Sequence, residues 1–154
     1  DPYFHTGIIL IGKKGDDISV DALTGQPIAS QRSTVASQYL QDKHADSDIK
    51  LYDTQDNAYL DLTSGRVRAM MSDKVTGIDW LKTDAGQNYE VKGDEISTEE
   101  DAMGIAFRKG DPLVAKFNTA LTEIKADGTY EKITGSYFGT GTTAAAQQAE
   151  ATTN

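Results

Sequence analysis

The stretch Pro27-Ile28-Ala29-Ser30-Gln31-Arg32-Ser33-Thr34-Val35 passes from a short apolar segment into the first turn of a predicted helix. The residues from Pro27 to Ser30 are predicted to form a strand. Ser33 and Thr34 are residue types that cap helix N-termini, so a helix is expected from there to about His44. A strand that leads directly into a helix begins a βαβ unit, and repeated units of this kind predict an α/β fold.

The same alternation of strands and helices continues in both directions from this stretch. Further strands are predicted at residues 7–14, 49–52, 67–71 and 103–107, and further helices at 54–64, 74–84, 111–126 and around 130–137. Residues 19–23 are predicted to form a short helical or turn segment. Gly65 and Gly128 stand where two of these helices end. The pattern predicts a mainly parallel five-stranded sheet with helices on both faces.

The composition is that of an ordinary globular protein and argues against several functional classes. The 154 residues carry a net charge of −9, which argues against nucleic-acid binding, because phosphate contacts need clustered Lys and Arg. There is no cysteine, so disulfides, thiolate metal sites and cysteine nucleophiles are excluded. The longest apolar run, residues 7–12, is too short to span a bilayer. The chain begins with Asp1, and we expect it to be a product from which a signal peptide has been removed.

Catalytic motifs are absent from the sequence. The two histidines, His5 and His44, have no metal-ligand spacing, and there is no nucleophile elbow or phosphate-binding glycine loop. We therefore expect a binding protein rather than an enzyme, with no cofactor and no metal. Residues 140–154 have no aliphatic anchor and are predicted to be a disordered tail.

Six short motifs occur in a fixed order along the chain. They are Asp1-Pro2-Tyr3-Phe4, Leu23-Thr24-Gly25, Gln31-Arg32-Ser33-Thr34-Val35, Asp61-Leu62-Thr63-Ser64-Gly65-Arg66, Gly104-Ile105-Ala106-Phe107-Arg108-Lys109-Gly110-Asp111 and Lys125-Ala126-Asp127-Gly128-Thr129-Tyr130-Glu131-Lys132-Ile133. In this order they resemble the polar amino-acid-binding proteins of ABC transporters, a group that includes histidine, lysine-arginine-ornithine, arginine and glutamine binders.

The resemblance implies a type II periplasmic-binding-protein fold. In that fold two α/β lobes, joined by two crossing strands, close on an amino acid in an interlobe cleft. On this template residues 6–102 form a complete second lobe. Residues 1–5 and 103–139 form the hinge and the returning part of a first lobe, whose opening strands and helices the template places outside this chain.

The same resemblance assigns ligand contacts to the carboxyl ends of the strands. Thr34 matches a threonine that hydrogen-bonds the ligand carboxylate, with the amide of Val35 beside it, and Asp73 matches the carboxylate that pairs with the ligand's α-ammonium. Gln31 lies where the family varies its side-chain selectivity, and Ser33 replaces a glycine that usually precedes the threonine. A helix N-terminus favours an anion in any protein. From the residues alone, however, the favoured interpretation is that Ser33 or Thr34 and Asp73 are simple N-caps.

Two further departures from the family pattern are present. Val35 replaces a common second threonine, which removes one hydroxyl donor, and Arg68 stands where an aspartate is frequent. The sequence offers no account of Arg68.

The function that the resemblance implies is delivery of a polar L-amino acid to the membrane permease of an ABC importer. The segments 57–62 and 79–83 resemble the arginine and lysine-ornithine binders and favour a basic ligand, with glutamine as the alternative. The expected location is the periplasm, or outside the cell with the protein tethered to the membrane. A sensor or adaptor role, read by a protein partner, is the alternative function.

The Asp111 to Ala126 helix is expected to expose an apolar stripe and to associate with the missing N-terminal segment or with a second copy.

Overall fold

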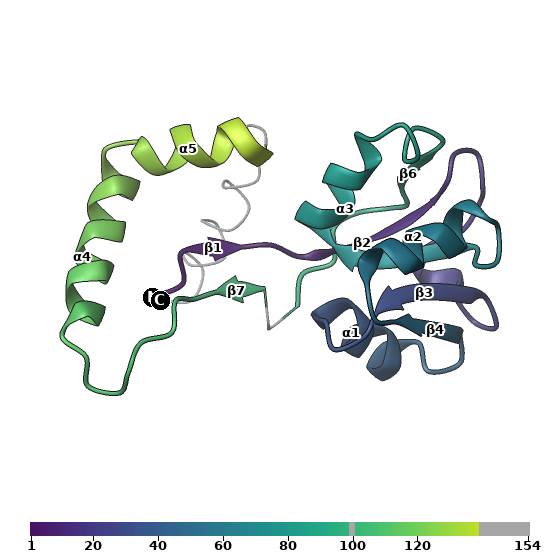
Figure 1. Ribbon diagram of the computed structural model, residues 1–154, viewed down its shortest axis with the longest axis horizontal. Helices are drawn as coiled ribbons and strands as arrows, with labels where there is room; N and C mark the ends of the chain where they lie inside the picture. Colours follow the sequence, from purple (N-terminus) through teal and green to yellow (C-terminus); the bar gives the residue numbers. More distant parts are fainter. Residues whose placement is uncertain (99–100, 139–154) are drawn as a thin grey trace. The chain divides into compact units, whose positions relative to one another are not determined.

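The computed structural model describes residues 1–98 and 101–138 (Figure 1). The chain divides into two compact units. The larger unit is Thr6–Asp101, and the smaller unit combines Asp1–His5 with the residues from Ala102 onward. The predicted tail at 140–154 lies outside the described residues.

The larger unit is built on a five-stranded sheet in the order β4-β3-β5-β2-β6. Its strands are β2 (Ile8–Lys13), β3 (Pro27–Gln31), β4 (Asp48–Tyr52), β5 (Ala69–Asp73) and β6 (Tyr89–Val91). β3 runs parallel to β4 and β5, whereas β2 runs antiparallel to β5 and β6. The sheet is therefore mixed: β3, β4, β5 and β6 run in one direction and β2 runs in the other. The parallel strands are those that helical crossovers connect, and β2 enters the sheet without such a crossover.

Helices cover both faces of this sheet, as the sequence predicts (Figure 1). α1 (Val35–Lys43) and the short 3-10 turn η1 (Val20–Ala22) pack on one face, and α2 (Gln55–Thr63) and α3 (Lys74–Leu81) on the other. Strand β2 contributes side chains to the cores on both faces of the sheet. Successive side chains point to opposite faces, so Ile8 and Leu10 enter one core while Ile9 and Ile11 enter the other. The α/β class with two covered faces is confirmed.

The prediction of a strand at 103–107 is wrong. The fifth strand of the large sheet is β6, in a segment for which the sequence pattern indicated no strand. Strand β7 (Ala102–Met103) instead pairs antiparallel with strand β1 (Phe4–His5) in a separate two-stranded sheet. Residues 104–107 belong to no strand, and Ile105 is 46% exposed. An apolar run forms a strand only where a partner edge is available, and β1 offers two residues of pairing.

The smaller unit also contains two helices, α4 (Leu113–Ala126) and α5 (Thr129–Phe138). The sequence predicts Asp111 as the N-cap and Pro112 as the first helical residue, but α4 begins at Leu113 with Pro112 at the cap position. Asp111 Oδ1 still accepts a hydrogen bond of 3.0 Å from the amide of Leu113. Tyr130 of α5 contacts the residue before β1, because its hydroxyl donates to the carbonyl of Tyr3 at 2.7 Å.

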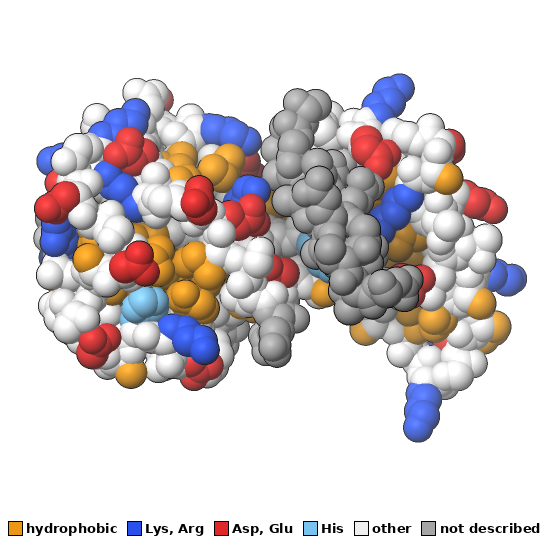
Figure 2. Space-filling model, turned by 180° about the vertical axis from the view of Figure 1, so that it is seen from behind, with side chains coloured by type: hydrophobic (Ala, Val, Ile, Leu, Met, Phe, Trp, Pro, Cys, Tyr) orange, Lys and Arg blue, Asp and Glu red, His pale blue; other side chains and the backbone are white. Residues whose placement is uncertain are grey.

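Large apolar side chains are exposed on this smaller unit. They are Tyr3, Met103, Ile105, Leu113, Val114, Phe117, Ile133 and Tyr137, and hydrophobic side chains are visible on the surface of this part in Figure 2. The predicted apolar stripe of α4 is only partly exposed, since Leu121 is buried. Within residues 1–98 and 101–138, none of the helices has both the length and the apolar character needed to cross a membrane.

Candidate functional site

The candidate site lies at the carboxyl edge of the parallel strands of the larger unit. β3 ends at Gln31 and β5 at Asp73. These two strands are direct neighbours with Ala29 opposite Met70, so they end within about one residue of each other. α1 follows β3 and α3 follows β5, so two helix N-termini also lie at this edge. The topology therefore brings the predicted residues at the two strand ends to the same side of the sheet.

Thr34 is the N-cap of α1, in agreement with the N-cap interpretation made from the residues alone. Its Oγ1 accepts from the amide of Ser37 at 3.1 Å, and Ser37 Oγ accepts from the amide of Thr34 at 3.0 Å, which forms a reciprocal capping box. The Thr34 hydroxyl also donates to the carbonyl of Gln31 at 2.7 Å. A ligand carboxylate would therefore receive this proton only if the hydroxyl turned away from Gln31.

Two backbone donors remain at the start of α1. The capping box satisfies the amides of Thr34 and Ser37, whereas the amides of Val35 and Ala36 donate to no acceptor among the residues that the structure describes. Free amides in the first turn, aligned with the helix dipole, are donors for an anion. The donors that this edge offers are thus the backbone amides of residues 35 and 36 more than the Thr34 hydroxyl.

Ser33 turns the chain into this helix with a left-handed backbone conformation. Its φ is 60°, and no other described residue except glycine has a positive φ. The position matches the family's usual glycine, which adopts this conformation without steric cost. The serine side chain is exposed, so its contribution to the site is the backbone turn that presents Thr34 and Val35.

Asp73 is the N-cap of α3 and keeps one oxygen available. Oδ1 accepts from the amides of Val75 and Thr76 at 3.0 and 3.2 Å. Within the described residues, Oδ2 makes no hydrogen bond or ion pair. The carboxylate is partly buried at the end of a buried strand. An oriented carboxylate of this kind can accept from an ammonium group while it continues to cap the helix.

Gln31 is directed toward the neighbouring strand. Its Nε2 donates to the carbonyl of Asp53 at 3.3 Å, just beyond β4. The adjacent Arg32 forms an exposed ion pair with Asp53 at 2.8 Å. Both side chains therefore hold the loop after β4 to the loop after β3.

Arg68 lies at the opposite end of β5 from Asp73. Its guanidinium donates to Gln26 Oε1 at 3.0 Å and to Asp17 Oδ1 at 2.5 Å. It therefore joins the loop that follows β2 to the residue that precedes β3. Arg68, which departs from the family pattern, therefore makes structural contacts away from the candidate site.

Lys74 and Glu95 also belong to this edge, although the sequence analysis did not single them out. Lys74 follows Asp73 directly, and its Nζ lies 2.5 Å from Glu95 Oε2. The other oxygen of Glu95 accepts from the amide of Gly7 at 2.8 Å. The two residues are 21 positions apart and on different elements, so no local sequence pattern could have paired them.

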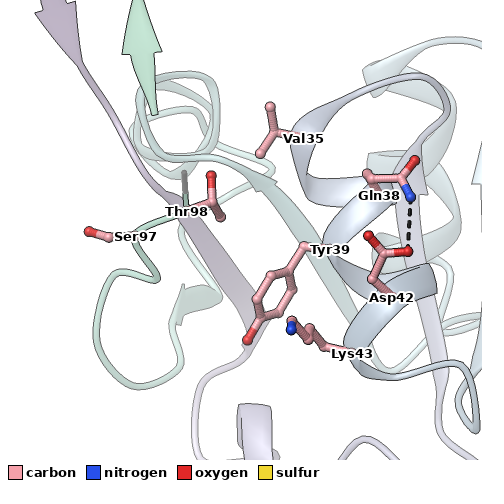
Figure 3. A pocket seen from close by; sticks show the side chains of 7 residues that line it. All are labelled: Val35, Gln38, Tyr39, Asp42, Lys43, Ser97 and Thr98. Carbon is pink, nitrogen blue, oxygen red and sulfur yellow. Dashed lines mark hydrogen bonds between the residues drawn. The ribbon is translucent and has the colours of Figure 1, made fainter. Parts of the chain in front are cut away.

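A pocket of about 410 Å³ adjoins α1 and shares Val35 with the candidate edge (Figure 3). Its lining residues are Val35, Gln38, Tyr39, Asp42, Lys43, Ser97 and Thr98. Gln38 Nε2 donates to Asp42 Oδ1 at 2.9 Å along the helix. Of the predicted site residues Val35 lines this pocket, whereas Thr34 and Asp73 do not, so the pocket overlaps the predicted site only at Val35. In residues 1–98 and 101–138 no three His, Asp or Glu side chains are grouped to hold a metal ion.

Comparison with known proteins places the chain among solute-binding proteins. Two relatives from Escherichia coli K12 are similar over most of its length. A putative ABC transporter arginine-binding protein 2 is 34% identical over 141 residues, and a lysine/arginine/ornithine-binding periplasmic protein is 33% identical over 138. These matches cover 89% and 84% of this chain but only 57% and 53% of the relatives. The chain therefore spans little more than half the length of these proteins.

Two solved structures have a similar fold. An ancestral arginine-binding protein, bound to arginine in one structure and to glutamine in another, has a TM-score of 0.76 in both cases. Identity is 35% and 34%, and the match covers 90% of this chain and 63% and 62% of that chain. A family model described as bacterial extracellular solute-binding proteins, family 3, matches residues 1–140. The resemblance inferred from the six motifs and the expectation of a binding protein rather than an enzyme are both confirmed. The chain belongs to family 3 of the bacterial extracellular solute-binding proteins.

Proposed function

We propose that this chain binds a free polar L-amino acid, with arginine as the first candidate, and serves an ABC importer in the periplasm or, tethered to the membrane, outside the cell. The larger unit would be the complete second lobe of the binding protein. The proposal rests on one observation. Two free amides at the start of α1 and the Asp73 carboxylate at the start of α3 lie at the same edge of the sheet.

The chemistry of this edge is complementary to an amino acid. The amides of Val35 and Ala36 suit the α-carboxylate, and the open oxygen of Asp73 suits the α-ammonium. The relatives include proteins named as arginine-binding and lysine/arginine/ornithine-binding, and these names support a ligand with a basic side chain. Glutamine is the second candidate, because the ancestral arginine-binding protein was also solved with glutamine.

The expected affinity of residues 1–154 alone is low. A helix N-terminus contributes about 0.3–1 kcal/mol at an exposed site, and an accessible ion pair roughly 0–1 kcal/mol. Micromolar binding requires about 8 kcal/mol. We therefore expect millimolar binding by this chain, with tight binding reserved for a protein that contains a complete first lobe.

The test is an amide chemical-shift titration of residues 1–154 with L-arginine. Shifts should concentrate at Val35, Ala36, Val75 and Thr76. Agmatine, which is arginine without its carboxylate, should leave the α1 amides unshifted. If L-arginine, L-lysine and L-glutamine all leave these four amides unshifted at tens of millimolar, the proposed function is wrong.

Asp73→Asn separates the two roles of this residue. Asparagine caps a helix about as well as aspartate, so stability should hold, whereas the charge that attracts the ammonium is lost and arginine binding should weaken. Asp73→Ala should lose the cap as well, at a cost of about 0.5–2 kcal/mol in unfolding free energy.

A further inference from the structure

Three segments of the larger unit meet beside Asp73. The first is the start of β2, where Ile8 pairs with Asp73 itself. The second is the first residue of α3, Lys74, whose amide donates to the carbonyl of Gly7 at 3.0 Å. The third follows β6, where Ile96 and Ile8 exchange backbone hydrogen bonds of 2.9 and 3.0 Å. Asp73 is therefore fixed where the two chain segments that link the larger unit to the rest of the protein run side by side.

Glu95 connects all three segments through one carboxylate. Oε1 accepts from the amide of Gly7 at 2.8 Å, and Oε2 lies 2.5 Å from Lys74 Nζ. The side chains of Lys74 and Glu95 are 25% and 33% exposed, so this ion pair is largely shielded from water. Position 7 is also closely packed, because a Cβ atom there would stand 2.5 Å from the carbonyl oxygen of Ile96 and 2.8 Å from Glu95 Cγ. Only glycine leaves room for Glu95 to reach this amide.

Glu95 compensates the positive charge that Lys74 places beside Asp73. Lys74 is the residue next to Asp73, and its positive charge would oppose the approach of a ligand ammonium to that carboxylate. A like charge several ångströms away weakens binding, and burial reduces the screening by water and salt. Glu95 balances this charge and fixes the ammonium of Lys74 against the β2 segment, so that Asp73 Oδ2 stays open.

We propose that Glu95 is a positioning residue for the ammonium group of the ligand: it neutralises Lys74 beside Asp73 and anchors both to the backbone of Gly7. This inference rests on the proposed function, because it concerns the ligand contact of Asp73. Glu95 itself does not touch the ligand.

The test is L-arginine titration, by amide chemical shifts, of residues 1–154 and four variants. Glu95→Gln keeps an oxygen that can accept from Gly7 but removes the charge, so Kd should rise roughly 3- to 30-fold, the range that Coulomb's law gives for such a pair. Lys74→Met removes the opposing charge and should leave Kd unchanged or lower. The double variant Lys74→Met with Glu95→Gln should return Kd to within about twofold of the unmodified chain.

Asp79→Asn is the matched control. It removes a carboxylate from the Lys82 ion pair at the far end of the same helix, where the two side chains are 66% and 60% exposed, and should leave Kd unchanged. A merely structural role for Glu95 would give a loss of affinity that Lys74→Met does not rescue, and that result would overturn the inference. So would an unchanged Kd in Glu95→Gln. No response to L-arginine, L-lysine or L-glutamine in the unmodified chain would instead remove the proposed function, and this inference with it.

Discussion

The backbone of Gly77 in α3 lies directly against Ile11 in β2. A Cβ atom at position 77 would stand 2.9 Å from Ile11 Cδ1 and 2.9 Å from Ile9 Cδ1. Both isoleucines are almost fully buried, so a methyl group at position 77 would have to displace the ends of two side chains in the core. The helix whose first turn is capped by Asp73 thus packs on the sheet through a residue that has no side chain. The distance between α3 and the sheet, and with it the placement of the Asp73 edge, depends on this contact.

Gly77→Ala should therefore destabilise the larger unit. Alanine gains about 1 kcal/mol in helix propensity, but overpacking a tight core costs about 1–3 kcal/mol. We expect a net loss of roughly 0.5–2 kcal/mol in unfolding free energy. Urea unfolding followed by the fluorescence of Trp80, the single tryptophan, measures it directly. Adding Ile11→Val, which removes the crowded methyl group, should recover part of the loss, and an equal or larger loss in the double variant would contradict this explanation.

Ser33→Gly should stabilise the same unit. A left-handed conformation costs an ordinary residue about 1–2 kcal/mol, whereas the extra freedom of glycine in the unfolded chain costs about 0.5–1 kcal/mol. The expected net gain is therefore roughly 0.5–1 kcal/mol, measured by the same urea unfolding. Ser33→Ala is the control, because alanine retains the strain and should give no gain. A glycine variant less stable than the serine protein would show that the serine side chain makes a favourable contact.

Stability should fall at alkaline pH because of Tyr52. Its hydroxyl donates to Asp61 Oδ2 at 2.6 Å, and burial, together with this bond to a carboxylate, raises the pKa of Tyr52 to about 12 from 10.0. A folded pKa above the unfolded one gives a contribution that is complete below pH 10 and is lost as the pH rises toward 12. Unfolding free energies measured across this range should decline, and Tyr52→Phe should make the decline shallower. The remaining slope should include Tyr59, whose pKa burial also raises. An identical slope in Tyr52→Phe would exclude Tyr52 as the source.

The sequence was most informative where local chemistry decides the structure. The helices after β3 and β5 are capped by Thr34 and Asp73, as the capping interpretation predicts, because a capping side chain acts on amides two or three residues away. β6 was missed, because it has three residues and its pairing with β2 is set by a strand about 80 positions earlier. The ion pair of Lys74 with Glu95 is also beyond local reasoning, since it exists only after β2, α3 and the segment after β6 have come together.

The exposed apolar side chains of the smaller unit should make residues 1–154 self-associate. Leu113 and Phe117 on α4 are 51% and 46% exposed, and Ile133 on α5 is 52% exposed. Apolar side chains gathered on one small unit favour association with another surface. Light scattering coupled to size exclusion should show a mass that rises with concentration. Leu113→Glu with Phe117→Glu should return the chain to a monomer, whereas Lys116→Glu on the same helix, the control for added negative charge, should not. A concentration-independent monomer in the unmodified chain would show that these side chains do not drive association.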